Sequence, residues 1–233
     1  MRTVTTLSIC FMLTLSAFAQ KSIEKSIAYK DQNIEFDMKF AKNITLKLWD
    51  KSTIELKGTI STLGERNLDL YKLEVDENAS RIKIASNPEA IFKKFNEDRK
   101  NDKNTYYINE NEYTEEFTLY VPKKATLKIS SINGDLQADV VDGDFKADLI
   151  NGNIDIAEYN GNLDLSTING EIDLKVLNTS LKAETVQGQI YADDKLSLNS
   201  ADQVVGQKID GSFDTAANSL SLKTINGNIY LRR

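Results

Sequence analysis

Apolar residues recur with a period of nine along the second half of the chain. In these nine-residue units an amide or an acid precedes a glycine, whose place Thr179 takes in one unit, and a stretch of alternating apolar and polar residues follows. Alternation with a period of two is typical of a β-strand that buries one face. The repeat therefore predicts a short strand and a tight corner in every unit. The glycines expected at these corners are Gly134, Gly143, Gly152, Gly161, Gly170, Gly188 and Gly227.

Two architectures fit this pattern, a meander of hairpins and a coil that winds around a core. In a hairpin, the residue before the Asn-Gly pair and the residue after it would be neighbours on one face. The first residue is apolar in every unit, as at Ile150, whereas the second is polar, as at Asn153. A coil removes this conflict, because Ile150 and Ile154 both point inward on either side of an outer corner. We therefore expect a β-solenoid whose corner glycines have a positive φ.

The corner sequence indicates how long each coil is. Ile-Asn-Gly recurs at 132, 150 and 168, whereas the corners between them differ. This predicts coils of about eighteen residues with two strands each, and a three-sided coil of twenty-seven residues is the alternative. Like corners would then stack, so that the amides of Asn133, Asn151 and Asn169 hydrogen-bond along the axis.

The first half of the chain carries a looser version of the same pattern. Apolar residues recur ten apart, as at Ile34 and Ile44, without glycine corners. One segment departs from the β pattern: Asn87 followed by Pro88 is typical of the N-terminus of a helix. They predict a short helix over about 88–100, inside an insertion at 87–112 that covers an open sheet edge. We expect one all-β domain, a single β-solenoid with an irregular part at 20–122 and a regular nine-residue-repeat part at 123–233.

The first nineteen residues have the features of an export signal peptide. Arg2 precedes an apolar run from Leu7 to Leu15, and Ala17-Phe18-Ala19 forms an A-x-A cleavage site. The apolar run is shorter than a bilayer span, so no transmembrane segment is expected. The predicted mature chain begins at Gln20 and is periplasmic, or on the cell surface, or secreted.

Composition narrows the chemistry that this chain can perform. It contains no histidine, and its one cysteine, Cys10, lies inside the predicted signal peptide. These counts exclude histidine-dependent nucleophiles, histidine-ligated zinc and disulfides within the mature chain. Residues 132–194 hold thirteen acids and three lysines. This excess of acids argues against phosphate-rich partners, so we expect no nucleic acid ligand.

The acids of the regular stretch allow a calcium and a catalytic interpretation besides simple solvation. Calcium-binding nine-residue repeats need two glycine-rich turns and a fixed Asp, whereas each unit here has one glycine; loose binding at Asp142 and Asp144 remains compatible. Asp155 and Asp173 would stack on adjacent coils, and glycoside hydrolases use such paired carboxylates. Tight corners, however, do not build a cleft. We expect no enzyme activity and no cofactor, with a carbohydrate-active β-helix enzyme or a calcium-binding repeat protein as alternatives.

One stretch resembles a known group of bacterial proteins. Residues 117–129 contain Val121-Pro122-Lys123, and Ser-Ile-Asn-Gly-Asp follows at 131–135. This arrangement resembles the bacterial "putative adhesin" β-solenoid family, in which such a strand leads into repeated glycine corners. The head-GIN domains of Bacteroidota surface proteins are the next most similar group. The resemblance implies an envelope-associated β-solenoid without known catalytic residues.

Together these features predict an exported, non-catalytic protein of the bacterial envelope, with a recognition role or a purely structural one. A rigid, repetitive face suits a polymer or protein partner of the envelope, including a cationic one. The most regularly spaced outward acids mark the expected binding face, and they are Asp139, Asp148, Asp155, Asp164 and Asp173.

Overall fold

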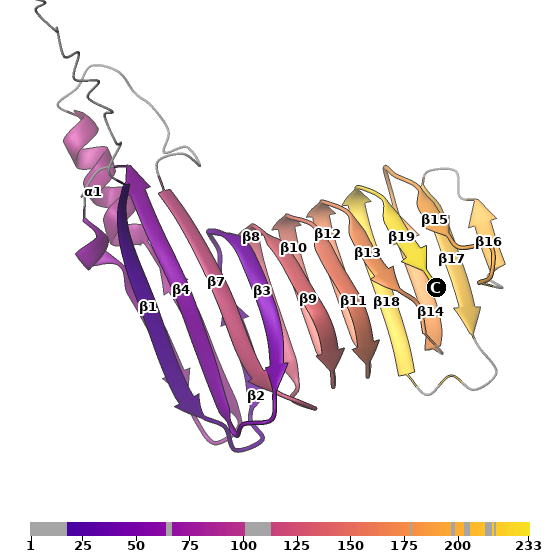
Figure 1. Cartoon of the computed structure of the whole chain (residues 1–233). Coiled ribbons are helices and arrows are strands. Elements are labelled where there is room, and N and C mark those ends of the chain that lie inside the picture. Colours follow the sequence, from indigo (N-terminus) through magenta and orange to yellow (C-terminus); the bar gives the residue numbers. More distant parts are fainter. Residues whose placement is uncertain are drawn as a thin grey trace, which may run out of the picture.

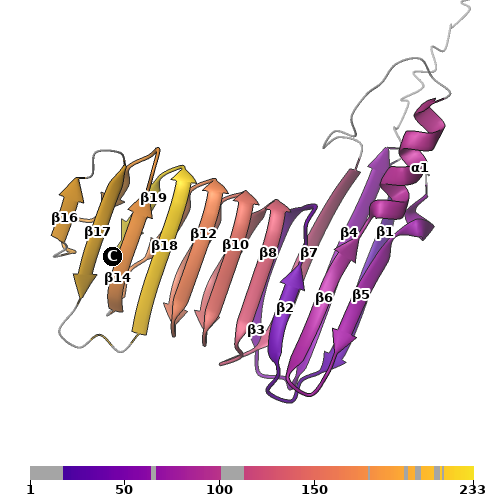
Figure 2. The ribbon, with the colours of Figure 1, turned by 180° about the vertical axis from the view of Figure 1, so that it is seen from behind.

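The structure, a computed structural model, describes residues 18–63, 67–100, 113–177, 179–196, 199–202, 206–212, 216 and 218–233. These residues form two open β-sheets packed face to face, with one α-helix at one end (Figures 1 and 2). The predicted all-β class is confirmed. Most of the predicted signal peptide and the predicted loop after the helix lie outside the described residues.

The two sheets have the following strand orders among the described residues. Sheet A, in front in Figure 1, consists of β1 (Phe18–Ala28), β4 (Thr53–Leu63), β7 (Tyr113–Pro122), β3 (Ala41–Trp49), β9 (Asp135–Asp142), β11 (Ile154–Asn160), β13 (Ile172–Lys175), β19 (Ile229–Arg232) and β15 (Ile190–Ala192). Sheet B, in front in Figure 2, consists of β5 (Lys72–Glu77), β6 (Arg81–Asn87), β2 (Asn33–Asp37), β8 (Leu127–Asn133), β10 (Phe145–Asn151), β12 (Leu163–Asn169), β18 (Asn218–Asn226), β14 (Thr179–Thr185), β17 (Gln207–Ser212) and β16 (Asn199–Asp202).

Consecutive strands from β8 to β13 alternate between the two sheets. Each strand pairs in parallel with the strand eighteen residues away, so that Phe145 lies opposite Leu163 in sheet B and Ile154 opposite Ile172 in sheet A. A meander of hairpins would instead pair consecutive strands antiparallel within one sheet, so this arrangement excludes the meander. In this stretch the chain has two strands per eighteen residues, as the corner sequence predicts.

Both ends of the molecule differ from these regular turns. β1 and β4 at one end, and β16 and β17 at the other, pair antiparallel, so both sheets are mixed. β18 and β19 also lie out of sequence order, between strands that precede them in the chain. The whole molecule is therefore a two-layer, sandwich-like arrangement with regular turns in its middle, and a single continuous β-solenoid is not shown.

One continuous apolar core fills the space between the sheets. The inward positions of each nine-residue unit supply it, as Ile154 and Ile156 do in β11 and Leu163 and Leu165 in β12. Their burial removes apolar surface from water, which is the main favourable contribution to folding.

The residue before each corner is the main departure from the predicted pattern. Val141 and Tyr159 are buried as expected, but Ile150 is 40% exposed and Ile168 is 39% exposed. The strands of sheet B alternate strictly, so an inward residue precedes each isoleucine and the isoleucine points out. In β9 and β11 two successive outward residues, such as Val140 and its predecessor, shift the alternation by one. The prediction of an inward residue is therefore wrong at the Ile-Asn-Gly corners.

The predicted helix is present as α1 (Glu89–Lys100), preceded in the chain by the 3₁₀-helix η1 (Leu68–Leu70). The Asn87 side-chain oxygen accepts a hydrogen bond from the Glu89 N–H at 3.1 Å, which caps the start of α1. Ile91 and Phe95 are buried, and Phe92 packs edge-to-face on Tyr113 with ring centroids 5.0 Å apart. α1 thereby closes the end of the core beside β1 and β4 (Figure 1). No helix in the described part of the chain has the length and apolar character needed to span a membrane.

Candidate functional site

The predicted corner glycines lie in two columns on opposite edges of the molecule. A methyl group at Gly152 would overlap the Gly134 carbonyl oxygen, and this relation repeats along the first column. The first column holds, in spatial order, Gly134, Gly152, Gly170, Gly227 and Gly188.

The second column is formed by Gly143 and Gly161. These two glycines have the expected positive φ, 115° and 133°. Gly152 does not have a positive φ, and neither do the other glycines of the first column. The prediction is therefore wrong there, because close backbone stacking, rather than backbone conformation, excludes a side chain.

The asparagines before the first column form the predicted ladder. The Asn151 Nδ2 group donates to Asn133 Oδ1 at 2.9 Å, and Asn169 Nδ2 donates to Asn151 Oδ1 at 2.7 Å. Asn226 extends the ladder by donating to Asn169 Oδ1 at 2.6 Å. These amides satisfy one another, so the corners hold the turns together and have a structural role.

The five acids predicted to form one binding face lie on two opposite faces. Asp139, Asp155 and Asp173 belong to the outer side of sheet A, whereas Asp148 and Asp164 belong to the outer side of sheet B. The alternation between sheets separates them, because units nine residues apart fall on different sheets. A single ligand surface cannot contain all five.

On sheet B the two acids are paired with lysines. Lys146 Nζ lies 2.7 Å from Asp164 and 3.4 Å from Asp148, and Lys128 Nζ lies 3.4 Å from Asp148. The hydrogen bond to Asp164 raises the pKa of Lys146. These acids therefore do not form an excess of negative charge at this place.

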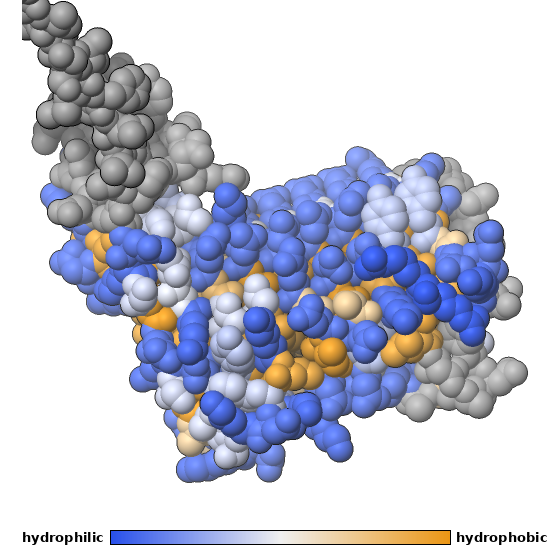
Figure 3. Space-filling model, in the orientation of Figure 1, coloured by the Kyte–Doolittle hydropathy of each residue, from blue (hydrophilic) through white to orange (hydrophobic). Residues whose placement is uncertain are grey.

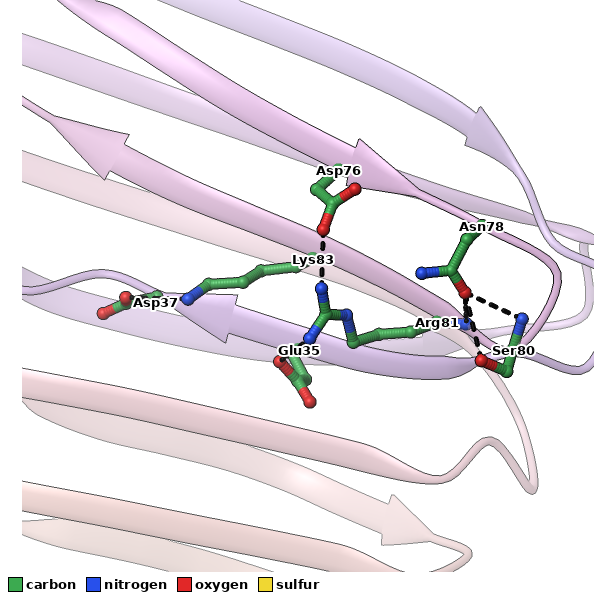
Figure 4. Close-up of polar contacts among 7 residues, drawn as sticks. All are labelled: Glu35, Asp37, Asp76, Asn78, Ser80, Arg81 and Lys83. Carbon is green, nitrogen blue, oxygen red and sulfur yellow. Dashed lines mark hydrogen bonds and ion pairs between the residues drawn. The ribbon is translucent and has the colours of Figure 1, made fainter.

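The same pattern of paired charges continues toward the helix end of sheet B (Figure 4). Arg81 contacts Asp76 at 2.6 Å, and Lys83 contacts Asp37 at 3.3 Å. Asn78 Oδ1 accepts the Arg81 N–H at 2.9 Å and thereby holds the turn between β5 and β6. The outer face of sheet B is thus crossed by ion pairs between neighbouring strands.

On sheet A, Asp155 and Asp173 lie on adjacent strands, as predicted. Arg232 binds both, with Nε 2.7 Å from Asp173 Oδ1 and a terminal nitrogen 3.7 Å from Asp155 Oδ1. Burial raises the pKa of Asp173, and the charge of Arg232 opposes this rise. The guanidinium of Arg232 thus bridges the two carboxylates and offsets part of their negative charge.

A continuous row of outward side chains crosses all nine strands of sheet A. Neighbours in this row are direct partners on adjacent strands. We call it the polar row, and its members in spatial order are Glu24, Lys57, Thr118, Thr45, Gln137, Asp155, Asp173, Tyr230 and Tyr191.

The first part of the polar row lies in an open hollow of about 620 Å³. Thr45, Thr118 and Gln137 line its floor and provide hydroxyl and amide groups, while Lys57 and Glu24 form an ion pair at 3.3 Å. Figure 3 shows this face as mostly hydrophilic, with apolar groups near its middle. On the same sheet, Val140 of β9 is 42% exposed. The hollow therefore offers uncharged hydrogen-bonding groups beside one lysine, Lys57, and two acids, Glu24 and Glu116.

Aromatic side chains lie at two places on this face, at the β19/β15 end and on β3 and β7. Tyr191 and Tyr230 stack with centroids 5.2 Å apart and planes inclined by 10°, and Tyr191 is 49% exposed. Trp49 instead packs against Tyr120 at 5.2 Å, and Lys51 lies 4.4 Å above its ring. Neighbours thus occupy Trp49, whereas the tyrosine pair leaves surface for a ligand.

A buried polar cluster under α1 was not foreseen from the sequence. Glu115 is completely buried and accepts a hydrogen bond from the Tyr113 hydroxyl. Burial raises the Glu115 pKa to about 7, although the hydrogen bond from Tyr113 acts in the opposite direction. Tyr71 lies in the same cluster, where burial and the Glu115 charge raise its pKa. Strict alternation over 113–121 could have revealed Glu115, since it occupies an inward position among apolar residues.

Metal binding was the other chemistry suggested by the acids. Among the residues with described positions, no three acid or cysteine side chains are grouped so as to hold a metal ion. Asp142 and Asp144 instead accept hydrogen bonds from Asn160 and Asn162 of the next turn, both at 2.8 Å. These two acids thus belong to the stacking of the corners.

No family model matches this sequence, and no curated protein matches it either. Among solved structures, a "putative cell adhesion protein" from Clostridium sporogenes superposes with a TM-score of 0.56 at 11% identity, over 91% of this chain and 99% of that one. A "putative adhesin" from Bacteroides fragilis covers 91% of this chain and 97% of its own at 12% identity, with a TM-score of 0.34. The first likeness shows that the two proteins share a fold, and the second is too loose to carry an argument.

Proposed function

We propose that this protein is a non-catalytic recognition module of the bacterial envelope, which binds a surface polymer along the polar row of sheet A. The observation that carries this proposal is the continuity of the row across nine strands, from the hollow to the tyrosine pair. We also regard β8–β13 as coils of a β-solenoid, a rigid support that holds equivalent side chains at the strand spacing of about 4.8 Å.

The chemistry of the row favours a polymer rich in hydroxyl and amide groups, such as a polysaccharide. Thr45, Thr118 and Gln137 can donate and accept hydrogen bonds, and the exposed face of Tyr191 can pack on the C–H face of a sugar ring. Lys57 and Arg232 each lie beside two acids, so the face keeps an excess of negative charge and disfavours a strongly anionic polymer. A fold shared with a "putative cell adhesion protein" is compatible with this role.

The test is capture of envelope polysaccharide by the immobilised protein. Thr45→Val with Thr118→Val removes two hydroxyls from the hollow while keeping β-branched side chains that suit strands. The matched control, Ser130→Ala with Ser221→Ala, removes two hydroxyls from the outer face of sheet B. We expect severalfold weaker capture by the sheet A variant alone. Equal capture by both variants would refute the proposed face, and turnover of the polysaccharide by the unmodified protein would favour the enzyme interpretation.

The acids provide a second, independent comparison. Changing Asp139, Asp155 and Asp173 to Asn alters sheet A, and changing Asp148 and Asp164 to Asn alters sheet B. A polymer bound on sheet A should respond to the first set only. A response to the second set alone would move the binding face to sheet B.

The proposal requires export, and we infer that residues 1–19 act as the signal peptide. Cleavage after Ala19 would leave β1 starting at Gln20, with most of its pairing to β4 retained. The intact mass of the protein purified from its native host should correspond to residues 20–233. A mature species that still contains Met1 would contradict this part of the proposal.

A further inference from the structure

The C-terminal strands occupy a place that their position in the chain does not predict. β18 lies between β12 and β14 in sheet B, and β19 lies between β13 and β15 in sheet A. In Figures 1 and 2 these yellow strands separate strands that precede them in the sequence. The last turn of the chain, residues 218–232, thus fills a slot between two earlier turns.

The walls of this slot have the register of direct neighbours. Leu220 pairs with Leu163 on one side and with Leu181 on the other. Leu163 and Leu181, the two wall residues, are eighteen residues apart in the chain. Ile229 likewise separates Ile172 from Ile190, again eighteen residues apart. Eighteen residues is the spacing at which β10 pairs directly with β12. The slot could therefore close in the regular register if the C-terminal turn left it.

The corner contacts support the same conclusion. Thr167 Oγ1 donates to the Gly152 carbonyl at 2.8 Å, and eighteen residues further along the equivalent pair would be Thr185 and Gly170. In the structure the Thr224 hydroxyl donates to the Gly170 carbonyl at 2.9 Å instead, and the Thr185 hydroxyl donates to the Gly227 carbonyl at 2.8 Å. Both walls thus bind the inserted turn with the groups that would otherwise bind each other.

A departing C-terminal turn would need a new apolar partner. Leu220, Leu222, Ile229 and Leu231 are almost completely buried in the slot, so leaving it would expose all four to water. An identical slot in a second copy of this chain offers the same walls, the same register and the same corner contacts.

We propose that the slot between β12/β13 and β14/β15 accepts residues 218–232 of a second copy, so that two chains assemble by exchanging their C-terminal turns. Exchange of identical elements creates a dimer without new types of contact. The covalent connection gives the C-terminal turn an effective concentration of about 1 mM at the slot of its own chain. The closed monomer is therefore favoured at low protein concentration, and the exchanged dimer becomes competitive as protein concentration approaches this value.

Cysteine pairs can report which chain fills the slot, in a Cys10→Ser background without other thiols. Asp164, Ser221 and Lys182 point outward from β12, β18 and β14, with Ser221 between the other two. Adjacent strands are about 4.8 Å apart and next-but-one strands about 9.6 Å, and a disulfide requires Cα atoms within about 7 Å. Asp164→Cys can therefore bond to Ser221→Cys, but not to Lys182→Cys while the slot is filled.

The test mixes the two single variants Asp164→Cys and Ser221→Cys, unfolds them in urea and refolds them together before oxidation. We expect a covalent dimer of one chain of each kind, whose yield rises severalfold as concentration increases from micromolar to millimolar. Glu35→Cys with Ser221→Cys is the matched control, because Glu35 lies in the same outer row of sheet B, on β2, away from the slot. Equal dimer in both mixtures, or none in either, would refute the exchange.

A double variant tests closure of the slot within one chain. Asp164→Cys with Lys182→Cys should form its disulfide slowly, whereas Asp164→Cys with Ser221→Cys should form it rapidly. Complete absence of the first disulfide would show that the slot does not close. Urea midpoints equal to that of the parent protein would establish that these exposed substitutions leave the fold intact.

Discussion

At the scale of single residues, the corner glycines are required for two different reasons. Gly143 and Gly161 have a positive φ that other residues adopt at a cost. Gly152 has an ordinary φ, but the Gly134 carbonyl oxygen occupies the place that its side chain would need. The sequence shows the same Asn-Gly or Asp-Gly pair in both cases, so it does not distinguish these reasons.

The stacking requirement can be measured at Gly152. Gly152→Ala places a methyl group against backbone that cannot rotate away, and we expect a loss of about 3 kcal/mol in the free energy of unfolding. Asn153→Ala is the adjacent control, which loses one hydrogen bond to the Glu171 N–H and should cost about 1 kcal/mol. Urea denaturation of both variants gives the comparison. Equal midpoints would contradict the close stacking of the corners.

Glu115 presents a second residue-scale question, that of a carboxyl group without access to solvent. Its pKa is raised from 4.5 to about 7 in the folded protein by burial. The folded state therefore binds a proton more tightly than the unfolded state does. The stabilisation is fully present below about pH 4.5 and is lost as pH rises to about 7, in total about 3 kcal/mol.

This predicts a specific pH dependence of stability. Between about pH 5 and 8 the free energy of unfolding should fall for the unmodified protein, and Glu115→Gln should remove most of that slope because the amide does not ionise. At pH 8 the variant should be the more stable of the two. Urea midpoints at several pH values test this, and parallel pH profiles for both proteins would show that Glu115 does not titrate in this range.

At the scale of elements, α1 acts as the closure of one end of the core. Ile91, on the inner side of this helix, is completely buried, whereas Lys93 on the same helix is exposed. Ile91→Ala should lower the free energy of unfolding by roughly 3 kcal/mol through the lost contacts and the cavity. Lys93→Ala should change it by less than about 0.5 kcal/mol. Thermal unfolding followed by circular dichroism measures both, and similar midpoints would show that α1 is not anchored through Ile91.

The elements also show what the sequence can and cannot predict. The nine-residue period predicts the strands from β8 to β13, their eighteen-residue register and the Asn ladder, because each depends on residues close together in the chain. Asn87 and Pro88 predict α1 for the same reason. Ile150 is exposed because β10 alternates strictly, whereas a shift of the alternation in β9 and β11 buries Val141 and Tyr159. The repeat alone does not reveal which strands carry this shift.

The candidate site was harder to predict than the fold. Asp155 and Asp173 were expected to be neighbours and they are, yet their partner Arg232 comes from a strand fifty-nine residues after Asp173. Thr45 and Thr118 enter the same hollow from strands whose pairing no local pattern indicates. Contacts between distant segments decide both arrangements.

At the scale of the whole molecule, stability should vary along the stack. Each turn contacts its neighbours only, so turns in the middle are held on both sides and the outermost strands on one. β10–β13 lie in the middle, whereas β1 and β5 form outer edges of their sheets. Amide hydrogens in β10–β13 should exchange at least about tenfold more slowly than those in β1 and β5, a difference of about 1.4 kcal/mol in opening free energy.

Hydrogen exchange in the C-terminal turn can show whether protection depends on interior position alone or also on whether a segment can leave the stack as a unit. By position, β18 and β19 are interior strands, and if position alone decided protection they would exchange as slowly as β12 and β13. If they leave the slot as a unit, their amides become accessible without opening of the turns on either side. Hydrogen exchange followed by mass spectrometry should therefore show β18 and β19 exchanging faster than β12 and β13, although all four have partners on both sides. Equal rates for the two pairs of strands would mean that the C-terminal turn opens only together with the rest of the stack.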